Sequence, residues 1–360
     1  MFKLLHRLQI VKTWKNLWLK ILDPVNLLMA ADKANSHKSD RMSKALFNVN
    51  LAESIMNLRE RLEARCWIPS PYVEFDVVEN GKKRRIEWIR NHEDHVVQQA
   101  IVQVLLPLFM KKFILDTYSG LPGRGPDTAI VRLRHMLNLL NYYTDYHYWC
   151  YEADVHHYYP TTRGDMMMRF LEHHIGCDWT LWILNTIIMN HPIGRPLGDP
   201  LSPLLMNVYL MDIDVAAKQV FKLPVYVRYC DNFVSADRDK GKMNSFQDYL
   251  HEQLDARSLV LNTNEQIYPC KRGPVDFIGY WFDGYHVRLR KSSERKVRHA
   301  YHRFEKHQTT EEYQRLSSYW GMCKRLPAGD KLWSKVTGGR TLKDIWKHVK
   351  ELREEPSDLI

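Results

Sequence analysis

The amino-acid sequence predicts an α+β protein with a helical beginning, a strand-rich middle and a basic helical end. Apolar residues recur at helical spacing before residue 70, and short apolar strands alternate with helical segments between residues 148 and 290. After Arg290 the pattern is helical again and strongly basic. With 360 residues, of which 45% are hydrophobic and 26% charged, the chain has room for a large core divided among subdomains.

The first 70 residues are expected to be helical, most clearly in "LAESIMNLRERLEARCW". The first thirty are expected to form a basic amphipathic helix that ends near Asp23-Pro24. Basic residues interrupt every apolar run there, so neither a secretory signal nor a membrane span is predicted. The six cysteines form no C-x-x-C pair and suggest no disulfide framework, which favours the cytoplasm.

Pro69 and Pro71 end the helical pattern, and "YVEFDVVENGKKRRIEWI" follows. This segment predicts a β-hairpin with Asn80-Gly81 as its turn, because Asn-Gly between β-rich arms is a strong hairpin signal. Arg84 and Arg85 lie in its basic second arm. A buried helix in "EDHVVQQAIVQVLLPLF", the glycine-rich loop "SGLPGRGPDTA" and the helix "IVRLRHMLNLL" come next.

The middle of the chain begins with the strand "YWCYEADV", followed by helices in "RGDMMMRFLEHHI" and "PLSPLLMNVYLMDIDVAAKQV". The stretch "VRYCDNFV" predicts two short arms that meet in a tight turn at Asp231-Asn232. A helix in "MNSFQDYLHEQLDARS" and the strands "DFIGYWF" and "YHVRLR" follow. A hairpin of this kind can hold a metal ion on a carboxylate at its tip, and it can equally be an ordinary surface turn.

A second carboxylate, Asp154, closes the strand in "CYEADV". Two aspartates at the ends of neighbouring strands could share two Mg²⁺ ions, or Mn²⁺ in their place, with the backbone carbonyl of Val155 as a further oxygen ligand. The alternative is that Asp154 and Asp231 each belong to a plain turn.

The loop "GRPLGDPLSPLLMN" lies between the two aspartates. Its glycines would let the backbone approach a nucleotide or a base pair closely, because glycine has no side chain in the way. It also predicts a helix start, with Asp199 or Ser202 as N-cap and a proline in the first turn. Both interpretations can hold together.

The net charge of +10 and the pI of about 9.2 indicate a polyanionic partner, with nucleic acid favoured over a membrane. The excess is concentrated in residues 288–306, where eight lysines and arginines face only Glu294 and Glu305.

The ordered set "ADVHHYYP", "GRPLGDPLSPLLMN", "RYCDNFV" and "DFIGY" resembles the palm of a reverse transcriptase. It is most similar to the bacterial lineage that includes group II intron, retron, diversity-generating and defence-associated (Abi-like and unknown-group) enzymes. The resemblance continues in "KRRIEWIRNHEDHVVQQAI" for the fingers and in "RLRKSSERKVRHAYHRFEKH" and "LSSYWGMCKRL" for the thumb. It implies a right-hand polymerase fold with fingers, a palm of antiparallel sheet and packed helices, and a helical thumb. The implied segments are an N-terminal helical extension (1–70), fingers and palm (71–285) and a basic thumb (286–360).

The resemblance also implies a role for particular residues. Asp154, Asp231 and Asn232 would be catalytic, with Asp154, Val155 and Asp231 as metal ligands. Tyr159 would be the steric gate against a ribose 2′-hydroxyl. The other implied contacts are those to the incoming dNTP (Arg84, Arg85, Leu197, Gly198) and those to nucleic acid (Tyr229, Gly279, Arg290, Lys291, Arg295).

Three positions depart from the pattern of the family. Asn232 stands where the family usually has a second aspartate, and Leu197 stands in place of a glutamine, as in the diversity-generating enzymes. Glu265 occupies the place of a lysine that donates a proton to pyrophosphate, with Lys271 as the candidate substitute.

The implied function is RNA-directed DNA synthesis in a bacterial anti-phage defence system, by two-metal nucleotidyl transfer. No RNase H, endonuclease or zinc-ribbon segment follows the thumb, which favours a compact enzyme with a dedicated noncoding RNA as template or scaffold. Its substrates would be dNTPs and its product cDNA, of low fidelity or repetitive sequence, and a second subunit or a second copy is a further expected partner. The alternatives are a diversity-generating retroelement enzyme, and a catalytically weakened RNA-binding scaffold or partner of a second polymerase.

Overall fold

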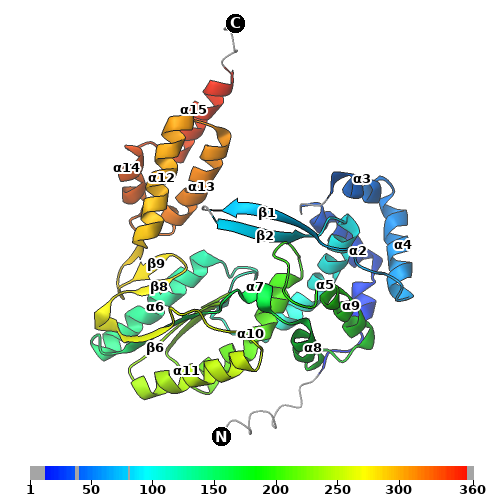
Figure 1. Ribbon diagram of the computed structural model, residues 1–360, viewed down its shortest axis with the longest axis horizontal. Coiled ribbons are helices and arrows are strands. Elements are labelled where there is room, and N and C mark those ends of the chain that lie inside the picture. The colour runs from blue at the N-terminus through cyan, green and yellow to red at the C-terminus, as the bar shows by residue number, and fades with distance from the viewer. Residues whose placement is uncertain (1–12, 37–39, 80–81, 355–360) are drawn as a thin grey trace. The chain divides into compact units, whose positions relative to one another are not determined.

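The computed structural model describes residues 13–36, 40–79 and 82–354, without the side chains of residues 77–79, 82–86 and 351–354 (Figure 1). Helices and small sheets alternate along the chain, which confirms the predicted α+β class. The backbone packs as two compact units. The first unit comprises residues 1–122, 154–222 and 245–264, and the second comprises residues 123–153, 223–244 and 265–360. The predicted division into extension, fingers with palm, and thumb stays a prediction.

The first unit begins with four helices that precede the hairpin, as predicted. They are α1 (Leu17–Ile21), α2 (Pro24–Ala34), α3 (Arg41–Val49) and α4 (Leu51–Glu63). Asp23 caps α2 by accepting a hydrogen bond from the amide of Val25, and Asp40 caps α3 in the same way. The predicted N-terminal helix is only partly observed: residues 1–12 lie outside the described residues, and Trp14 forms a β-bridge with Ile175.

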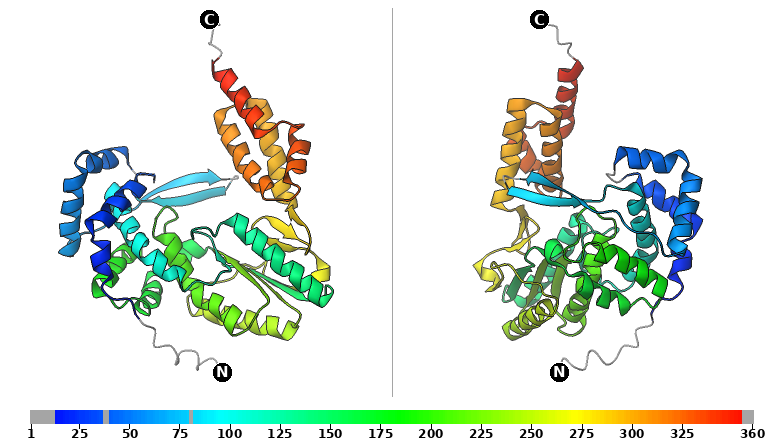
Figure 2. Two further views of the ribbon diagram at one scale, coloured as in Figure 1. Left: turned by 180° about the vertical axis from the view of Figure 1, so that it is seen from behind. Right: turned by 45° about the vertical axis from the view of Figure 1, so that its right-hand side comes forward.

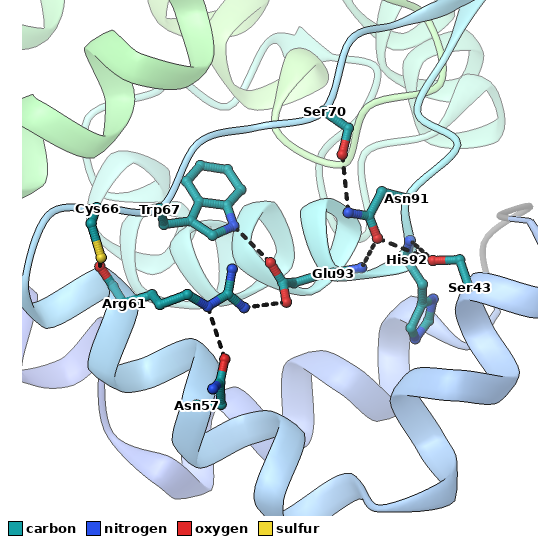
Figure 3. A network of polar contacts seen from close by, with 9 residues as sticks. All are labelled: Ser43, Asn57, Arg61, Cys66, Trp67, Ser70, Asn91, His92 and Glu93. Carbon is teal, nitrogen blue, oxygen red and sulfur yellow. Dashed lines mark hydrogen bonds and ion pairs between the residues drawn. The ribbon is translucent and has the colours of Figure 1, made fainter.

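Polar contacts join α3 and α4 to the start of α5 (His92–Met110), the predicted buried helix (Figure 3). Asn91 caps α5, and its amide nitrogen donates to Ser70 Oγ at 3.0 Å. Ser43 Oγ accepts a hydrogen bond from the amide of His92 at 2.9 Å. Glu93 accepts one from the indole of Trp67 at 3.0 Å and forms an ion pair with Arg61. The bonds from the backbone amides of His92 to Ser43 and of Glu93 to Asn91 satisfy groups that the helix itself leaves without partners.

The predicted hairpin is present as β1 (Val73–Glu79) and β2 (Lys82–Trp88), paired in antiparallel register from Val73↔Trp88 to Glu79↔Lys82. Its predicted turn, Asn80-Gly81, lies outside the described residues. The remaining elements of the first unit are β3 (Thr117–Tyr118), α7 (Tyr158–Thr161), α8 (Gly164–Glu172), α9 (Asp178–Met189) and α10 (Ser202–Gln219), together with most of α11 (Lys240–Asp255). Helix α9 was not predicted.

The second unit holds four strands that lie side by side in the order β5-β6-β4-β7. They are β4 (Trp149–Asp154), β5 (Val225–Tyr229), β6 (Asn232–Asp237) and β7 (Gln266–Pro269). The pairs β5–β6 and β4–β7 are antiparallel, and α6 (Pro126–Thr144) packs against β5. Nearly every position of β5 and β6 is buried, including the polar residues Arg228, Ser235 and Asp237, so both faces of these strands are covered.

A second small sheet and four helices complete this unit. The 3₁₀ turn Cys270–Arg272 leads into β8 (Val275–Phe277), β9 (Tyr280–Phe282) and β10 (Val287–Leu289), which pair in the order β10-β9-β8. The helices are α12 (Lys291–His307), α13 (Thr310–Lys324), α14 (Gly329–Thr337) and α15 (Leu342–Glu354), which confirms the predicted helical end. Helices α12 and α13 pack against each other, as the views in Figure 2 show. Across the described ranges, no helix is long and apolar enough to cross a membrane.

Candidate active site

The two units divide the candidate site residues between them. Those expected to contact the incoming nucleotide, together with Asp154 and Val155, belong to the first unit. Those expected at the hairpin tip and along the nucleic acid belong to the second (Tyr229, Asp231, Asn232, Gly279, Arg290, Lys291, Arg295).

Asp154 is the last residue of β4, and a partner far along the chain holds its carboxylate. Asn262 donates from its side-chain nitrogen to Asp154 Oδ2 at 2.7 Å and from its backbone amide to the Asp154 carbonyl at 2.7 Å. The adjacent bridge between Val155 and Leu261 uses the carbonyl of Asp154 and the amide of His156. The bridge therefore does not use the carbonyl of Val155, the group expected to contact a metal ion. Asn262 was not predicted as a site residue.

The two tyrosines that follow Asp154 have different surroundings. Tyr158 is 2% exposed, and its hydroxyl donates to the carbonyl of Met206 at 2.7 Å. Tyr159 is only partly buried. Tyr159, the residue expected to act as the steric gate, is thus the less buried of the two.

Backbone hydrogen bonds join Tyr159 to the glycine-containing loop. The amide of Arg195 donates to the carbonyl of Tyr159 at 2.8 Å, and the amide of Gly194 donates to the carbonyl of Thr162 at 2.8 Å. Gly194 has φ +90°, a left-handed conformation that favours glycine. Leu197 and Gly198 are both exposed. The structure therefore brings Tyr159 together with the loop that carries the expected nucleotide contacts.

The base of the β1–β2 hairpin is joined to the same loop. Tyr72 donates its hydroxyl to Asp199 Oδ2 at 2.7 Å, and His191 Nε2 lies 2.8 Å from Glu87 Oε1. Arg84 and Arg85 lie on β2 opposite Val77 and Asp76, and their side chains lie outside the described part of the structure.

Asp199 does not cap α10, so this prediction is wrong, as is the alternative that Ser202 does. The N-cap position is Leu201, Ser202 is already the first helical residue, and the predicted proline in the first turn is present. Asp199 is instead 5% exposed and accepts hydrogen bonds from Tyr72 and Gln98. Burial raises the pKa of Asp199 to about 6, against the opposing effect of these hydrogen bonds and of the nearby positive charge of Arg195.

The raised pKa of Asp199 predicts a pH-dependent stability. This pKa lies above the value of about 3.9 that Asp has in an unfolded chain. Between about pH 3.9 and about 6 the folded protein therefore holds a proton on Asp199 that the unfolded chain has lost. The stability that this proton gives is lost as pH rises through about 6. Asn does not titrate, so the Asp199→Asn variant lacks this loss of stability. We therefore expect the free energy of unfolding of the variant minus that of the wild type to increase from acidic to neutral pH. The increase should be on the order of 3 kcal/mol, since one pKa unit corresponds to about 1.4 kcal/mol.

Chemical denaturation at a series of pH values measures this difference. The exposed Asp165 serves as the control, because its hydrogen bond with Arg163 lowers its pKa, so Asp165→Asn should not produce a difference of that sign. A difference between Asp199→Asn and wild type that is independent of pH would contradict the prediction.

The β5–β6 hairpin carries Asp231 at its tip, with a turn one residue earlier than predicted. Tyr229 pairs with Asn232, so the turn residues are Cys230 and Asp231, and Asn232 is already the first residue of β6. Cys230 has φ +57°, an uncommon conformation for a residue other than glycine. Beneath the turn the fully buried Arg228 donates to the carbonyl of Cys230 at 2.8 Å.

Burial raises the pKa of Asp231, while hydrogen bonding from Asn232 and the charge of Arg228 act in the opposite direction. The side-chain nitrogen of Asn232 lies 3.4 Å from Asp231 Oδ1. A partly desolvated carboxylate supported by one amide and one guanidinium is a chemically suitable oxygen ligand for a hard cation.

The other candidates in the second unit lie around the small sheet and α12. The ring of Tyr229 packs edge-to-face on Phe277, with 6.4 Å between centroids. Gly279, in the β8–β9 turn, has φ +91°, and its carbonyl accepts a hydrogen bond from the backbone amide of Arg290. The guanidinium of Arg290 forms an ion pair with Asp276, whereas Lys291 and Arg295 are exposed on α12.

Glu265 and Lys271 flank β7 on its two sides along the chain. Glu265 accepts a hydrogen bond from the hydroxyl of Tyr151 at 2.6 Å. Lys271 follows Pro269, which pairs with Trp149 at the opposite end of β4 from Asp154. Lys271 as the substitute for the missing lysine stays a prediction.

The expected metal donors are two carboxylates and one backbone carbonyl, which are the hard oxygen ligands that Mg²⁺ and Mn²⁺ prefer. In the part of the chain that the structure describes, no three His, Cys, Asp or Glu side chains gather as a metal cluster. The two-metal site stays a prediction.

Comparison with known proteins finds two distant relatives, and no family model matches the chain. The protein YkfC of Escherichia coli is 24% identical over 204 residues, which cover 54% of this chain and 53% of YkfC. The COX1/OXI3 intron 2 protein of Saccharomyces cerevisiae is 20% identical over 269 residues, which cover 70% of this chain and 28% of the yeast protein. The match thus spans about half of one relative and less than a third of the other. A distant relationship to an intron protein is consistent with a protein of the reverse transcriptase type.

Proposed function

We propose that this chain is an RNA-directed DNA polymerase of a bacterial anti-phage defence system, acting in the cytoplasm. It would use dNTPs and a dedicated noncoding RNA to make cDNA. The observation that carries the proposal is a set of contacts in the first unit that hold Asp154 and the loop with Gly198. Asp154 is held by Asn262, Tyr159 follows five residues later, and the loop with Gly198 is bonded to Tyr159 and to the base of the hairpin.

Each of these groups has a task in nucleotidyl transfer. Asp154 and Asp231, with the carbonyl of Val155, would hold two Mg²⁺ or Mn²⁺ ions, which supply charge stabilisation for the attacking and leaving oxygens. Arg84 and Arg85 would bind the triphosphate, for which a guanidinium fork is suited. Tyr159 would exclude a ribose 2′-hydroxyl, and the exposed backbone of Leu197 and Gly198 would lie against the new base pair. Tyr229 and Gly279 would support the primer end.

Two other functions have a specific observation in their favour. Asn232 in place of an aspartate reduces the negative charge at the tip, which favours a catalytically weakened RNA-binding scaffold or a partner of a second polymerase. Leu197 in place of glutamine favours a diversity-generating enzyme. A second subunit or a second copy of the chain is compatible with all three.

The test is to purify the protein from its native host and sequence the nucleic acid that accompanies it. The same preparation is assayed for dNTP incorporation with Mg²⁺ and with Mn²⁺. A bound noncoding RNA and metal-dependent DNA synthesis support the polymerase, and adenine-specific errors would identify the diversity-generating alternative. Bound RNA without incorporation under either metal would favour the scaffold.

The exposed cations of α12 lead to a separate prediction for nucleic-acid binding. We expect Lys291→Glu with Arg295→Glu to weaken binding of a primer–template duplex more at low salt than at high salt. Loss of two phosphate contacts should reduce the slope of log K against log salt by about 2. Binding titrations at several salt concentrations measure the slope. Arg290→Gln is the comparison, because Asp276 already pairs with that guanidinium and a smaller change is expected. An unchanged slope in the double variant would show that this face of α12 is merely solvated.

A further inference from the structure

Three exposed tyrosines and the partly buried Tyr146 belong to the second unit, near the end of β4 remote from Asp154. Tyr142 and Tyr143, at the end of α6, are 80% and 76% exposed, and Tyr285 is 51% exposed. The ring of Tyr146 lies 5.8 Å from that of Tyr285, and the rings of Tyr142 and Tyr143 pack edge-to-face at 5.2 Å. We call these four residues the tyrosine surface. Large aromatic rings exposed to water in a group are unusual and commonly mark a binding surface.

The turn that carries Tyr285 is firmly held in place. Asp283 accepts hydrogen bonds from the amides of Tyr285 and His286, at 3.3 and 2.7 Å. Gly284, with φ +95°, lies so close to α6 that an added Cβ would come within 1.7 Å of Asn141 Nδ2. Because only glycine allows this approach, Tyr285 is held beside Tyr146 before any ligand arrives.

A pocket of about 230 Å³ opens beside Tyr146. Its walls include Tyr146, Tyr148, Cys150 and Phe282, and Asp283 lies at its edge. Gly273 also lines it, and a Cβ added there would meet no atom within 4 Å. The pocket is therefore aromatic, large enough for a planar heterocycle and bordered by a hydrogen-bond acceptor, which are common features of a base-binding pocket.

Cationic side chains surround this pocket and the tyrosine surface. Lys271 and Arg272 are exposed on the 3₁₀ turn that precedes Gly273, and Lys271 Nζ lies 3.0 Å from His147 Nε2. Asp283 is paired with the exposed Arg288 at 3.0 Å, so its negative charge is largely balanced. Aromatic rings among cations form the usual platform for single-stranded nucleic acid, on which bases stack while phosphates meet the cations.

The tyrosine surface lies away from Asp154. Cys270 donates its amide to the carbonyl of Tyr148, and Pro269 pairs with Trp149, so the pocket adjoins the first residues of β4. Asp154 is the last residue of that strand, about 17 Å farther along at the usual rise per residue.

We infer that the tyrosine surface and its pocket form a second nucleic-acid site, which binds single-stranded RNA or DNA by taking one unpaired base into the pocket. A paired base in a duplex does not expose its face to a ring, so the site should select single strands. The inference goes beyond the proposed polymerase activity and does not depend on it.

The test uses the full chain and a short fluorescein-labelled single-stranded oligonucleotide, as RNA and as DNA, with the same sequence as a duplex for comparison. Gly273→Leu adds a side chain at the lining of the pocket, on a backbone with φ 171° that any residue adopts, and Tyr285→Leu removes an exposed ring. We expect each variant to bind the single strand about tenfold more weakly, the effect of losing one stacked base, and the duplex as the wild type does.

Two further variants serve as controls. Tyr285→Phe keeps the ring and should restore single-strand affinity. Val131→Ala removes an exposed apolar side chain from α6, about three turns before Tyr142. It should leave the affinity for both the single strand and the duplex unchanged. If Gly273→Leu unfolds the protein, Tyr142→Leu with Tyr143→Leu at the exposed end of α6 replaces it. The inference would be overturned if the variants that remove a ring bound the single-stranded oligonucleotide as tightly as the wild type does. It would also be overturned if they lost affinity for the single strand and for the duplex equally.

Discussion

Asp231→Asn is expected to reduce nucleotide incorporation by at least about a thousandfold, the largest effect that we predict for this protein. The substitution keeps the shape of the side chain and leaves Arg228 and Asn232 in place beneath the turn. It removes the negative charge that would hold a divalent cation. Single-turnover incorporation of a dNTP on a primer–template, with Mg²⁺ and with Mn²⁺, measures the effect.

The thermal stability of Asp231→Asn shows whether a loss of incorporation comes from loss of a metal ligand or from unfolding of the protein. Because burial raises the pKa of Asp231, its ionised form costs folding energy, and the neutral Asn should leave thermal stability equal or higher. Asn232→Asp is the matched control, since it adds a carboxylate at the next position and should retain incorporation. Incorporation by Asp231→Asn at the wild-type rate would remove this carboxylate from the proposed metal site and favour the scaffold.

Tyr159→Ala is expected to lower the preference for dNTPs over ribonucleotides by on the order of a hundredfold in kcat/KM. Tyr159 is the accessible member of the tyrosine pair, and its carbonyl accepts the amide of Arg195 from the loop that bears Leu197 and Gly198. Removing the ring would open space for a 2′-hydroxyl without breaking that backbone bond. Competing incorporation of a dNTP and the matching ribonucleotide measures the ratio.

The neighbouring tyrosine supplies the control for this experiment. Tyr158→Phe removes the hydroxyl that donates to Met206 and should cost about 1 kcal/mol of stability while leaving the nucleotide preference intact. Tyr159→Phe keeps the ring and should also keep the preference. A dNTP preference that survives in Tyr159→Ala would mean that another group excludes the ribose hydroxyl.

The candidate site places its expected nucleotide contacts on one unit and its hairpin tip on the other. Within the first unit, the Arg195 amide is bonded to the Tyr159 carbonyl, and Asp199 of the same loop is bonded to Tyr72 at the hairpin base. We therefore expect substitutions at Asp199 or Tyr72 to act mainly on the KM for dNTP, because these residues position the loop and do not contact the reacting atoms themselves.

Local sequence signals predicted the elements that depend on neighbours in the chain. Asn80-Gly81 between β-rich arms predicted the hairpin that the structure has as β1 and β2, and helical periodicity predicted α4, α5, α10 and the C-terminal helices. The resemblance also named candidate site residues, and the structure joins one of them, Tyr159, to Arg195 of the loop that carries two others; the site itself stays a prediction. Such signals are visible because turn chemistry and burial of one helix face act over a few residues.

Tertiary structure decided the rest. The turn at the hairpin tip consists of Cys230 and Asp231 because Tyr229 of β5 pairs with Asn232 of β6. This register is set by the burial of both strands. Asp199 became a buried acceptor instead of a helix cap because Tyr72, 127 positions earlier, reaches it. Asn262 holds Asp154 from 108 positions away, and Tyr285 reaches Tyr146 only through the close approach of Gly284 to α6. The sequence by itself predicted most of the elements and named the candidate residues, whereas the partners of those residues depend on contacts between distant segments, which leave no periodic or local pattern to read.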